Sequence, residues 1–181
     1  MSPELDKKLC EEFPEIFKNR HADMHSTAMC WGFDIGDGWY NIIYYLCSQL
    51  MRDYNRAKRD YDYCLTMLQV EDKSAWRQWH HNTYTPERLE NLKKDLDECH
   101  IPVAVQVKEK FGGLRFYVER ATDKQYDMIS FVENLSYIVC EECGTMNDVH
   151  LYDMGWMRTL CRTHATERYG KSAVDEFHEG V

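Results

Sequence analysis

The feature that most constrains the fold is a pair of short chelating motifs near the C-terminus. Cys140 and Cys143 form a C-x2-C motif, and Cys161 and His164 form a C-x2-H motif. Three thiolates and one imidazole match a closed tetrahedral zinc site, and a two-residue gap lets each pair chelate one ion from a tight turn. Because four protein ligands leave no position open to water, the spacing predicts one structural zinc ion rather than a catalytic one.

The residues around these motifs predict a small module built on the metal. Gly144 follows the first pair, where a turn must point its amides back toward sulfur. Two short β-like runs, VHLYD and GWMRTL, meet at residues 153–155, and CRTHATERYG has helical character. Together these features resemble a treble-clef finger over about residues 138–172, a fold that serves many functions. His150 is a conceivable substitute ligand, although its position within a strand favours a surface or packing role.

The rest of the chain predicts a mostly helical body. Residues 4–12 form a short helix, and apolar residues recur at helical spacing from Trp39 to Leu68, which predicts one helix of about 30 residues. Thr85-Pro86 starts a further helix, and Thr122 with Gln125 forms a capping box for the next. Between Trp31 and Tyr40, the glycine- and aromatic-rich WGFDIGDGWY indicates an ordered loop.

Residues 103–119 predict a β-hairpin that turns about Gly112-Gly113, which would place Lys110 directly opposite Arg115. Period two sorts its residues onto two faces. The apolar face consists of Val105, Val107, Phe111, Leu114, Phe116 and Val118, and the polar face of Gln106, Lys108, Lys110, Arg115 and Tyr117.

The charges of the polar face need a compensating anion. One alternative is internal pairing with Asp34, Asp37 or Glu119, and the other is a phosphate-bearing ligand held by arginine and stacked on tyrosine. Asp37 could instead cap the helix that follows it. The candidate ligand-binding residues are Lys108, Lys110, Arg115, Tyr117, Asp34, Asp37 and Trp39.

Composition narrows the class of protein. The formal net charge is -9, which disfavours general binding to nucleic acid phosphates. The charged N-terminal segment lacks the apolar core of a signal peptide, and no run is long enough to span a membrane, so we expect a cytoplasmic protein. Eight cysteines in such a chain favour reduced thiols and metal binding over disulfides.

These elements predict an α+β fold. A helical body with a long helix and a β-hairpin or small antiparallel sheet would occupy residues 1–137. The treble-clef-like zinc module would occupy residues 138–181 and pack on the body as one unit.

Three segments in order, CWGFDIGDGWYNIIYYLC, VKEKFGGLRFYVE and CEECG with GWMRTLCRTH, resemble a group of small uncharacterised proteins carried by bacteriophages and prophages. The matching segments span most of residues 31–164. The resemblance implies an accessory phage protein of the host cytoplasm, a setting in which inhibitors of host defence are common.

We therefore expect a non-enzymatic protein, without catalytic residues, that binds a host protein or a small phosphorylated, nucleotide-like ligand. One alternative is a nucleic-acid-associated zinc protein, for which Trp76, Trp79 and His80 could stack on bases. The other is a nucleotide hydrolase that uses His21, His25, Asp34 or Asp37.

Overall fold

The computed structural model describes residues 1–179, and these form two compact units. One unit contains residues 1–49 and the chain from residue 102 onward, and the other contains residues 50–101. The predicted boundary between residues 137 and 138 stays a prediction. The separate unit of residues 50–101 was not predicted.

The fold is mixed α and β, as the sequence predicts at this coarse level. The elements of the first unit are α1 (Pro3–Glu12), η1 (Ala28–Trp31), β1 (Phe33–Asp34), η2 (Asp37–Trp39), α2 (Tyr40–Leu50), β2 (Val103–Lys110), β3 (Gly113–Glu119), α6 (Asp123–Leu135), η3 (Ser136–Ile138), β4 (Val149–Asp153), β5 (Met157–Cys161), α7 (Arg162–Tyr169) and α8 (Lys171–Glu179). The second unit contains α3 (Arg52–Leu68), α4 (Gln78–Thr83) and α5 (Pro86–Asp97).

The predicted hairpin is part of a three-stranded sheet in the order β1-β2-β3. Strand β1 lies parallel to β2 and pairs Phe33 with Val107 and Asp34 with Lys108. The sequence did not predict β1, because its residues lie in a segment with the composition of a loop. The strand brings the DIGDG segment, residues 34–38, to the edge of the hairpin.

The hairpin turns one residue earlier than predicted. Lys110 pairs with Gly113, so Phe111 and Gly112 form the turn, with φ angles of 55° and 76°. Two positive φ angles are typical of a type I′ turn. Gly113 serves another purpose, because a Cβ at this position would lie 2.4 Å from the ring of Tyr137.

This register corrects two predictions about the hairpin. Lys108, and not Lys110, lies directly opposite Arg115. Phe111 was assigned to the apolar face, but its side chain is 63% exposed because it lies in the turn.

The core of the first unit lies on the apolar face of the sheet. Val107, Leu114 and Phe116 are buried there. Phe17 packs edge-to-face on Phe33 and on Phe116, with ring centroids 5.0 and 6.2 Å apart. Aromatic pairs in this geometry add to the free energy gained by burial.

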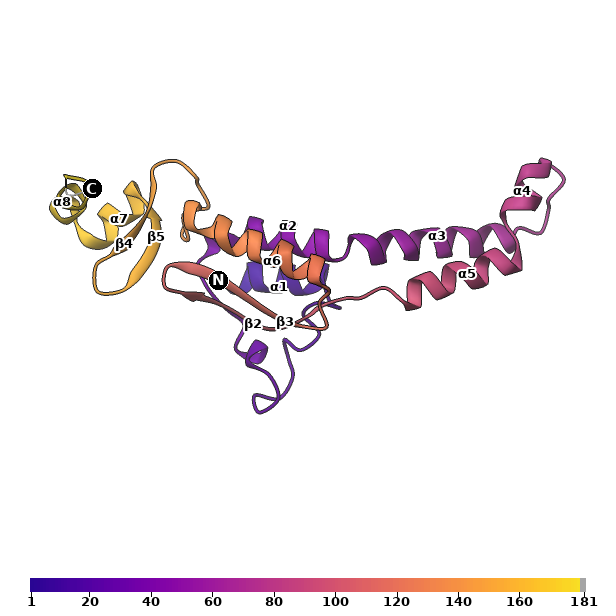
Figure 1. The fold of residues 1–181 in the computed structure, drawn as a ribbon, viewed down its shortest axis with the longest axis horizontal. Coiled ribbons are helices and arrows are strands. Elements are labelled where there is room, and N and C mark those ends of the chain that lie inside the picture. Colours follow the sequence, from indigo (N-terminus) through magenta and orange to yellow (C-terminus); the bar gives the residue numbers. More distant parts are fainter. Residues whose placement is uncertain (180–181) are drawn as a thin grey trace. The chain divides into compact units, whose positions relative to one another are not determined.

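Helix α6 runs alongside β3 and covers the edge of that strand (Figure 1). The amide of Leu114 donates to Oγ of Ser136 at 2.9 Å, and the amide of Phe116 donates to Oε1 of Glu133 at 2.8 Å. Side chains therefore satisfy backbone donors that an edge strand would otherwise leave unpaired. The predicted capping box begins this helix, since Thr122 accepts from the amide of Gln125.

The predicted 30-residue helix is wrong: it is two helices, α2 and α3, separated at Met51. Met51 has φ -85° and ψ -9°, a helical φ with a ψ that departs from the regular helix. Met51 stays in the right-handed region, so the helix is interrupted without an interruption of the apolar periodicity in the sequence. A pattern of side chains therefore gave no sign of the break.

In the second unit, α3 and α5 pack against each other, and Thr85 caps α5 as predicted by accepting from the amide of Arg88. The rings that could have formed a base-stacking pocket contact one another. Trp79 and His80 are stacked with ring centroids 3.6 Å apart, and Trp76 lies 5.6 Å from His80.

The cover on the sheet edge gives a test of the fold. Ser136 is buried, so we expect Ser136→Ala to leave the Leu114 amide without a partner and to lower the free energy of unfolding by about 1–3 kcal/mol. The measurement is urea unfolding of the purified chain. Ser130→Ala, at an exposed position of the preceding helix α6, is the control and should change stability by less than about 0.5 kcal/mol. Equal effects of the two substitutions would contradict this account of the edge.

Candidate metal centre and the adjoining cleft

The structure brings Cys140, Cys143, Cys161 and His164 together in one cluster that could hold a metal ion. Nδ1 of His164 lies 3.1 Å from Sγ of Cys161 and 3.6 Å from Sγ of Cys140, and the Sγ atoms of Cys143 and Cys161 are 4.0 Å apart. Ligands of a tetrahedral site with metal–sulfur bonds of 2.3 Å would lie about 3.5–3.8 Å apart. The donor atoms therefore already lie near the separations that one ion requires.

Local backbone structure explains why these four residues converge. Cys140 to Gly144 form a tight turn, which we call the knuckle, in which the amide of Gly144 donates to the carbonyl of Cys140 at 2.8 Å. Cys161 ends β5 and is the N-cap of α7, so that His164 lies in the first turn of that helix. Nε2 of His164 faces away from the sulfurs, 4.0 Å from a carboxylate oxygen of Glu167. The predicted hairpin between the motifs is formed by β4 and β5.

The thiols of the cluster have different proton affinities in the chain without metal. Burial raises the pKa of Cys140. Hydrogen bonds from backbone amides, first that of Cys161 and then those of Cys143 and Glu142, lower the pKa by more than burial raises it, so the pKa of Cys140 lies below its ordinary value. Burial and the neighbouring thiols raise the pKa of Cys143 to about 11. A bound cation would reverse this penalty, because a thiol that coordinates a metal is deprotonated.

The DIGDG segment packs directly on the knuckle. The amide of Gly38 donates to the carbonyl of Glu141 at 2.8 Å. A Cβ on Gly38 would lie 2.2 Å from the carbonyl oxygen of Cys140 and 2.4 Å from the amide nitrogen of Gly144. Glycine is therefore required for two backbones to approach this closely. The same close approach makes the DIGDG segment part of the support of the metal cluster.

Two predicted ligand-binding residues, Asp37 in this segment and Trp39 just after it, form hydrogen bonds within the chain. Trp39 is fully buried and donates from its indole Nε1 to the carbonyl of Val139, at 2.9 Å. Asp37 accepts a hydrogen bond from the amide of Ser2 at 2.6 Å.

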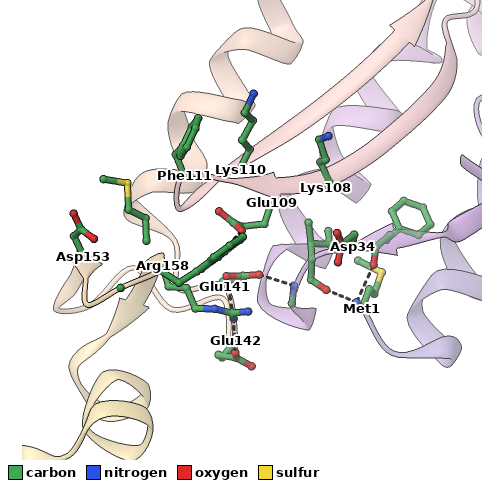
Figure 2. A pocket seen from close by; sticks show the side chains of 16 residues that line it. Met1, Asp34, Lys108, Glu109, Lys110, Phe111, Glu141, Glu142, Asp153 and Arg158 are labelled. Carbon is green, nitrogen blue, oxygen red and sulfur yellow. Dashed lines mark hydrogen bonds and ion pairs between the residues drawn. The ribbon is translucent and has the colours of Figure 1, made fainter. Parts of the chain in front are cut away.

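A cleft of about 870 Å³ adjoins the knuckle, between the DIGDG segment, the hairpin tip and the β4–β5 turn (Figure 2). Glu109 points into it, and its carboxylate accepts from the amide of Gly112 at 2.6 Å and from the indole of Trp156 at 3.0 Å. The side chains of Lys108 and Lys110 point away from Glu109 and Glu141 (Figure 2).

The floor of the cleft contains a buried carboxylate that the sequence did not single out. Glu141 is only 2% exposed and lies 3.4 Å from Nη1 of Arg158, which also contacts Glu142 at 3.3 Å. Burial raises the pKa of Glu141, and the charge of Arg158 offsets part of that shift. The sequence signal that could have indicated this buried carboxylate is the position of Glu141 between Cys140 and Cys143, because a tight turn there fixes the direction of the side chain.

The polar face of the hairpin keeps three of its predicted residues together. Nζ of Lys108 lies 5.8 Å from the ring centroid of Tyr117, on the same face as Arg115. Arg115 donates to the carbonyl of Leu114 at 2.6 Å and to the hydroxyl of Tyr137 at 3.0 Å. The guanidinium is therefore held by neutral oxygens.

Lys110 lies at the end of β2, the strand that also carries Lys108, and its Nζ is 5.2 Å from the ring centroid of Phe111. Asp34 is beside Lys108 in register, but in the described part of the chain neither lysine forms an ion pair with a carboxylate. None of the predicted internal anions, Asp34, Asp37 or Glu119, therefore pairs with these lysines.

Comparison with family models, with curated proteins and with solved structures gave no match. The resemblance to phage proteins therefore stays a prediction. Among the described residues, no helix is long and apolar enough to cross a membrane.

The contact between Gly38 and the knuckle gives a second prediction. We expect Gly38→Ala to lower the free energy of unfolding by about 1–3 kcal/mol or more, because two backbone segments must separate to admit the methyl group. It should also speed the release of bound metal to a chromogenic chelator.

The matched control is Gly155→Ala, because Gly155 has a positive φ of 89° but no atom within 4 Å of the added Cβ. Gly155→Ala should lower the free energy of unfolding by only about 1–2 kcal/mol, the cost of placing alanine at a positive φ. It should not speed the release of metal. Metal release at the same rate in both variants would show that the DIGDG segment does not support the cluster.

Proposed function

We propose that this chain is a non-enzymatic binding protein with a treble-clef-like C-terminal module held by one structural zinc ion. The observation that carries the proposal is the cluster of three thiolates and one imidazole at near-tetrahedral separations. Soft thiolates with an imidazole suit zinc, and four protein ligands close its coordination shell. A closed shell favours a role in stability over a role in chemistry.

The order of elements supports the treble-clef assignment. A knuckle carries Cys140 and Cys143, the hairpin of β4 and β5 follows, and Cys161 and His164 lie at the start of α7. Tyr152 and Leu160 form a core behind the ligands together with Ala165 and Val174. This core is small, so a metal ion would supply much of the free energy that holds it together.

The binding surface that we propose is the basic strand face, defined by Lys108, Lys110, Arg115 and Tyr117. Its lysines have aromatic neighbours and no carboxylate partners among the described residues. Tyr137 holds Arg115 in place, which lowers the entropic cost of binding an anion. A ligand with phosphate groups and a flat ring would meet both the cations and the exposed Tyr117.

We propose that the ligand is a small phosphorylated, nucleotide-like molecule or an acidic surface of a host protein. The resemblance to phage proteins supports a role in the cytoplasm of a host cell, with inhibition of host defence as one such role. Contacts of Asp34 with the ligand are part of this proposal, since that residue lies beside Lys108.

The zinc proposal predicts about one zinc ion per chain by elemental analysis of protein purified without chelators. Cys161→Ser should lose the metal and unfold the module, because structural zinc contributes directly to folding. Near-UV circular dichroism would report the loss through Tyr152, which packs in the module.

Cys99→Ser is the matched control, because Cys99 lies in the other unit, just beyond the end of α5, and its thiol donates to the carbonyl of Asp95 at 3.3 Å. It should retain the zinc. A chain without zinc, or Cys161→Ser protein with an unchanged spectrum and metal content, would overturn the assignment.

The binding proposal predicts that Lys110→Glu weakens the binding of ATP or pyrophosphate at least about tenfold, because a charge-assisted contact becomes repulsive. Thermal stability should change little, since Lys110 is exposed and has no carboxylate partner among residues 1–179. Isothermal titration with each probe measures the affinity. Affinity capture with wild-type and variant chains, followed by mass spectrometry, tests whether the ligand is a host protein.

Lys93→Glu makes the same charge change at an exposed position of α5 and is the control. It should bind probes and partners as the wild type does. If Lys110→Glu bound every probe and partner as Lys93→Glu does, the basic strand face would not be the binding surface.

A further inference from the structure

A second cluster of metal-binding side chains lies outside the thiolate cluster. Asp148, His150 and His178 each offer a ligand atom, and these atoms lie within 4.8 Å of one another. Nε2 of His150 is 3.0 Å from Oδ1 of Asp148, and the rings of His150 and His178 have centroids 4.5 Å apart. Neighbouring ligands on an ion with bonds of 2.0–2.1 Å lie about 3.0–3.4 Å apart, so only a small movement would be needed.

Packing brings these residues together from two distant parts of the chain. Asp148 immediately precedes β4, His150 lies in β4, and His178 lies in α8. Val174 is fully buried, and Phe177 packs on Tyr152 with ring centroids 4.7 Å apart. These contacts fix α8 against the hairpin, so the approach of His178 to His150 is a product of the fold.

Hydrogen bonds also orient the three side chains. The hydroxyl of the buried Tyr152 lies 3.0 Å from Nε2 of His178 and restrains the rotation of its ring. The carbonyl of Asp148 accepts from the amide of Arg162 at 3.0 Å, which fixes the backbone of Asp148. Metal-binding histidines are commonly oriented by hydrogen bonds of this kind, which raise the affinity for the metal by limiting the orientations of the ring.

We propose that Asp148, His150 and His178 form a second, exchangeable site for a divalent transition metal ion. Two imidazoles and one carboxylate suit zinc, nickel or iron(II), whereas calcium and magnesium prefer oxygen ligands alone. Three ligands leave at least one position open, and Asp148 is exposed while both histidines are half-buried. The ion therefore exchanges with solvent, unlike one enclosed by three thiolates.

Binding at this site would connect α8 to β4 through the metal. Since only the folded chain assembles the three ligands, added metal stabilises the folded state in proportion to its occupancy. This consequence does not depend on the basic strand face or on the ligand proposed for it. It also leaves the thiolate cluster intact, so the two metal sites can be tested separately.

The test is a titration of the zinc-loaded chain with Ni²⁺, followed by calorimetry and by thermal melting. The wild type should bind one further ion with a Kd below about 100 μM and melt at a higher temperature in its presence. Elemental analysis after the titration should find the original zinc retained, which separates a second site from exchange at the first.

Two variants remove ligands with little disturbance of the fold. Asp148 has a φ of 52°, a region that asparagine tolerates well, so Asp148→Asn removes the charge and keeps the backbone. His150→Phe keeps an aromatic ring beside Tyr152 and His178. Each should weaken Ni²⁺ binding at least about tenfold and abolish most of the thermal shift.

His25→Phe, at an exposed position far along the sequence, is the control and should bind as the wild type does. The proposal fails if the wild type binds no further Ni²⁺ in this range. It also fails if both ligand variants bind as tightly as His25→Phe, because the ion would then lie elsewhere. Retained zinc with lost Ni²⁺ binding in both variants is the supporting result.

Discussion

The close approach of the DIGDG segment to the knuckle is the interaction on which the first unit depends. Gly38 lies so near Cys140 and Gly144 that no side chain fits between the backbones. Beside it, the Gly36 amide donates to the Glu141 carboxylate at 3.1 Å. The turn that positions Cys140 and Cys143 is therefore also a surface on which the N-terminal segment packs, so each structure limits the movement of the other.

The knuckle contacts the sheet system from a second direction as well. The amide of Glu141 donates to the carbonyl of Thr159 at 2.9 Å, and the hydroxyl of Thr159 donates to the carbonyl of Gly112 in the hairpin turn at 2.6 Å. A chain of hydrogen bonds thus leads from the knuckle through β5 to the hairpin tip. The knuckle and the tip of the hairpin are therefore connected through β5.

The sequence predicted those features that local chemistry decides. The clustering of Cys140, Cys143, Cys161 and His164 was predicted because the spacing within each motif is short, and the caps at Thr85 and Thr122 were predicted for the same reason. The hairpin turn was misplaced by one residue, because both glycines of the Gly112-Gly113 pair were assigned to the turn. Only Gly112 lies in the turn, and Gly113 is a glycine because the ring of Tyr137 leaves no room for a Cβ. Strand β1 was missed because two residues carry too little pattern to indicate a parallel pairing. The cluster of Asp148, His150 and His178 needs the docking of α8, which no spacing encodes.

The contacts that join the DIGDG segment to the knuckle have a consequence for the order of folding. The hydrogen bond between Gly36 and Glu141 spans 105 residues, and the one between Trp39 and Val139 spans 100. Closing such long loops costs entropy before the contacts return any free energy, so we expect these contacts to form late. The helices of residues 50–101 rely on contacts that are nearer in sequence. The knuckle itself closes locally, and a metal ion that fixes it early would present a finished surface to the N-terminal segment. In this order, the metal would act as a folding template for the sheet before it acts as a brace for the finished protein.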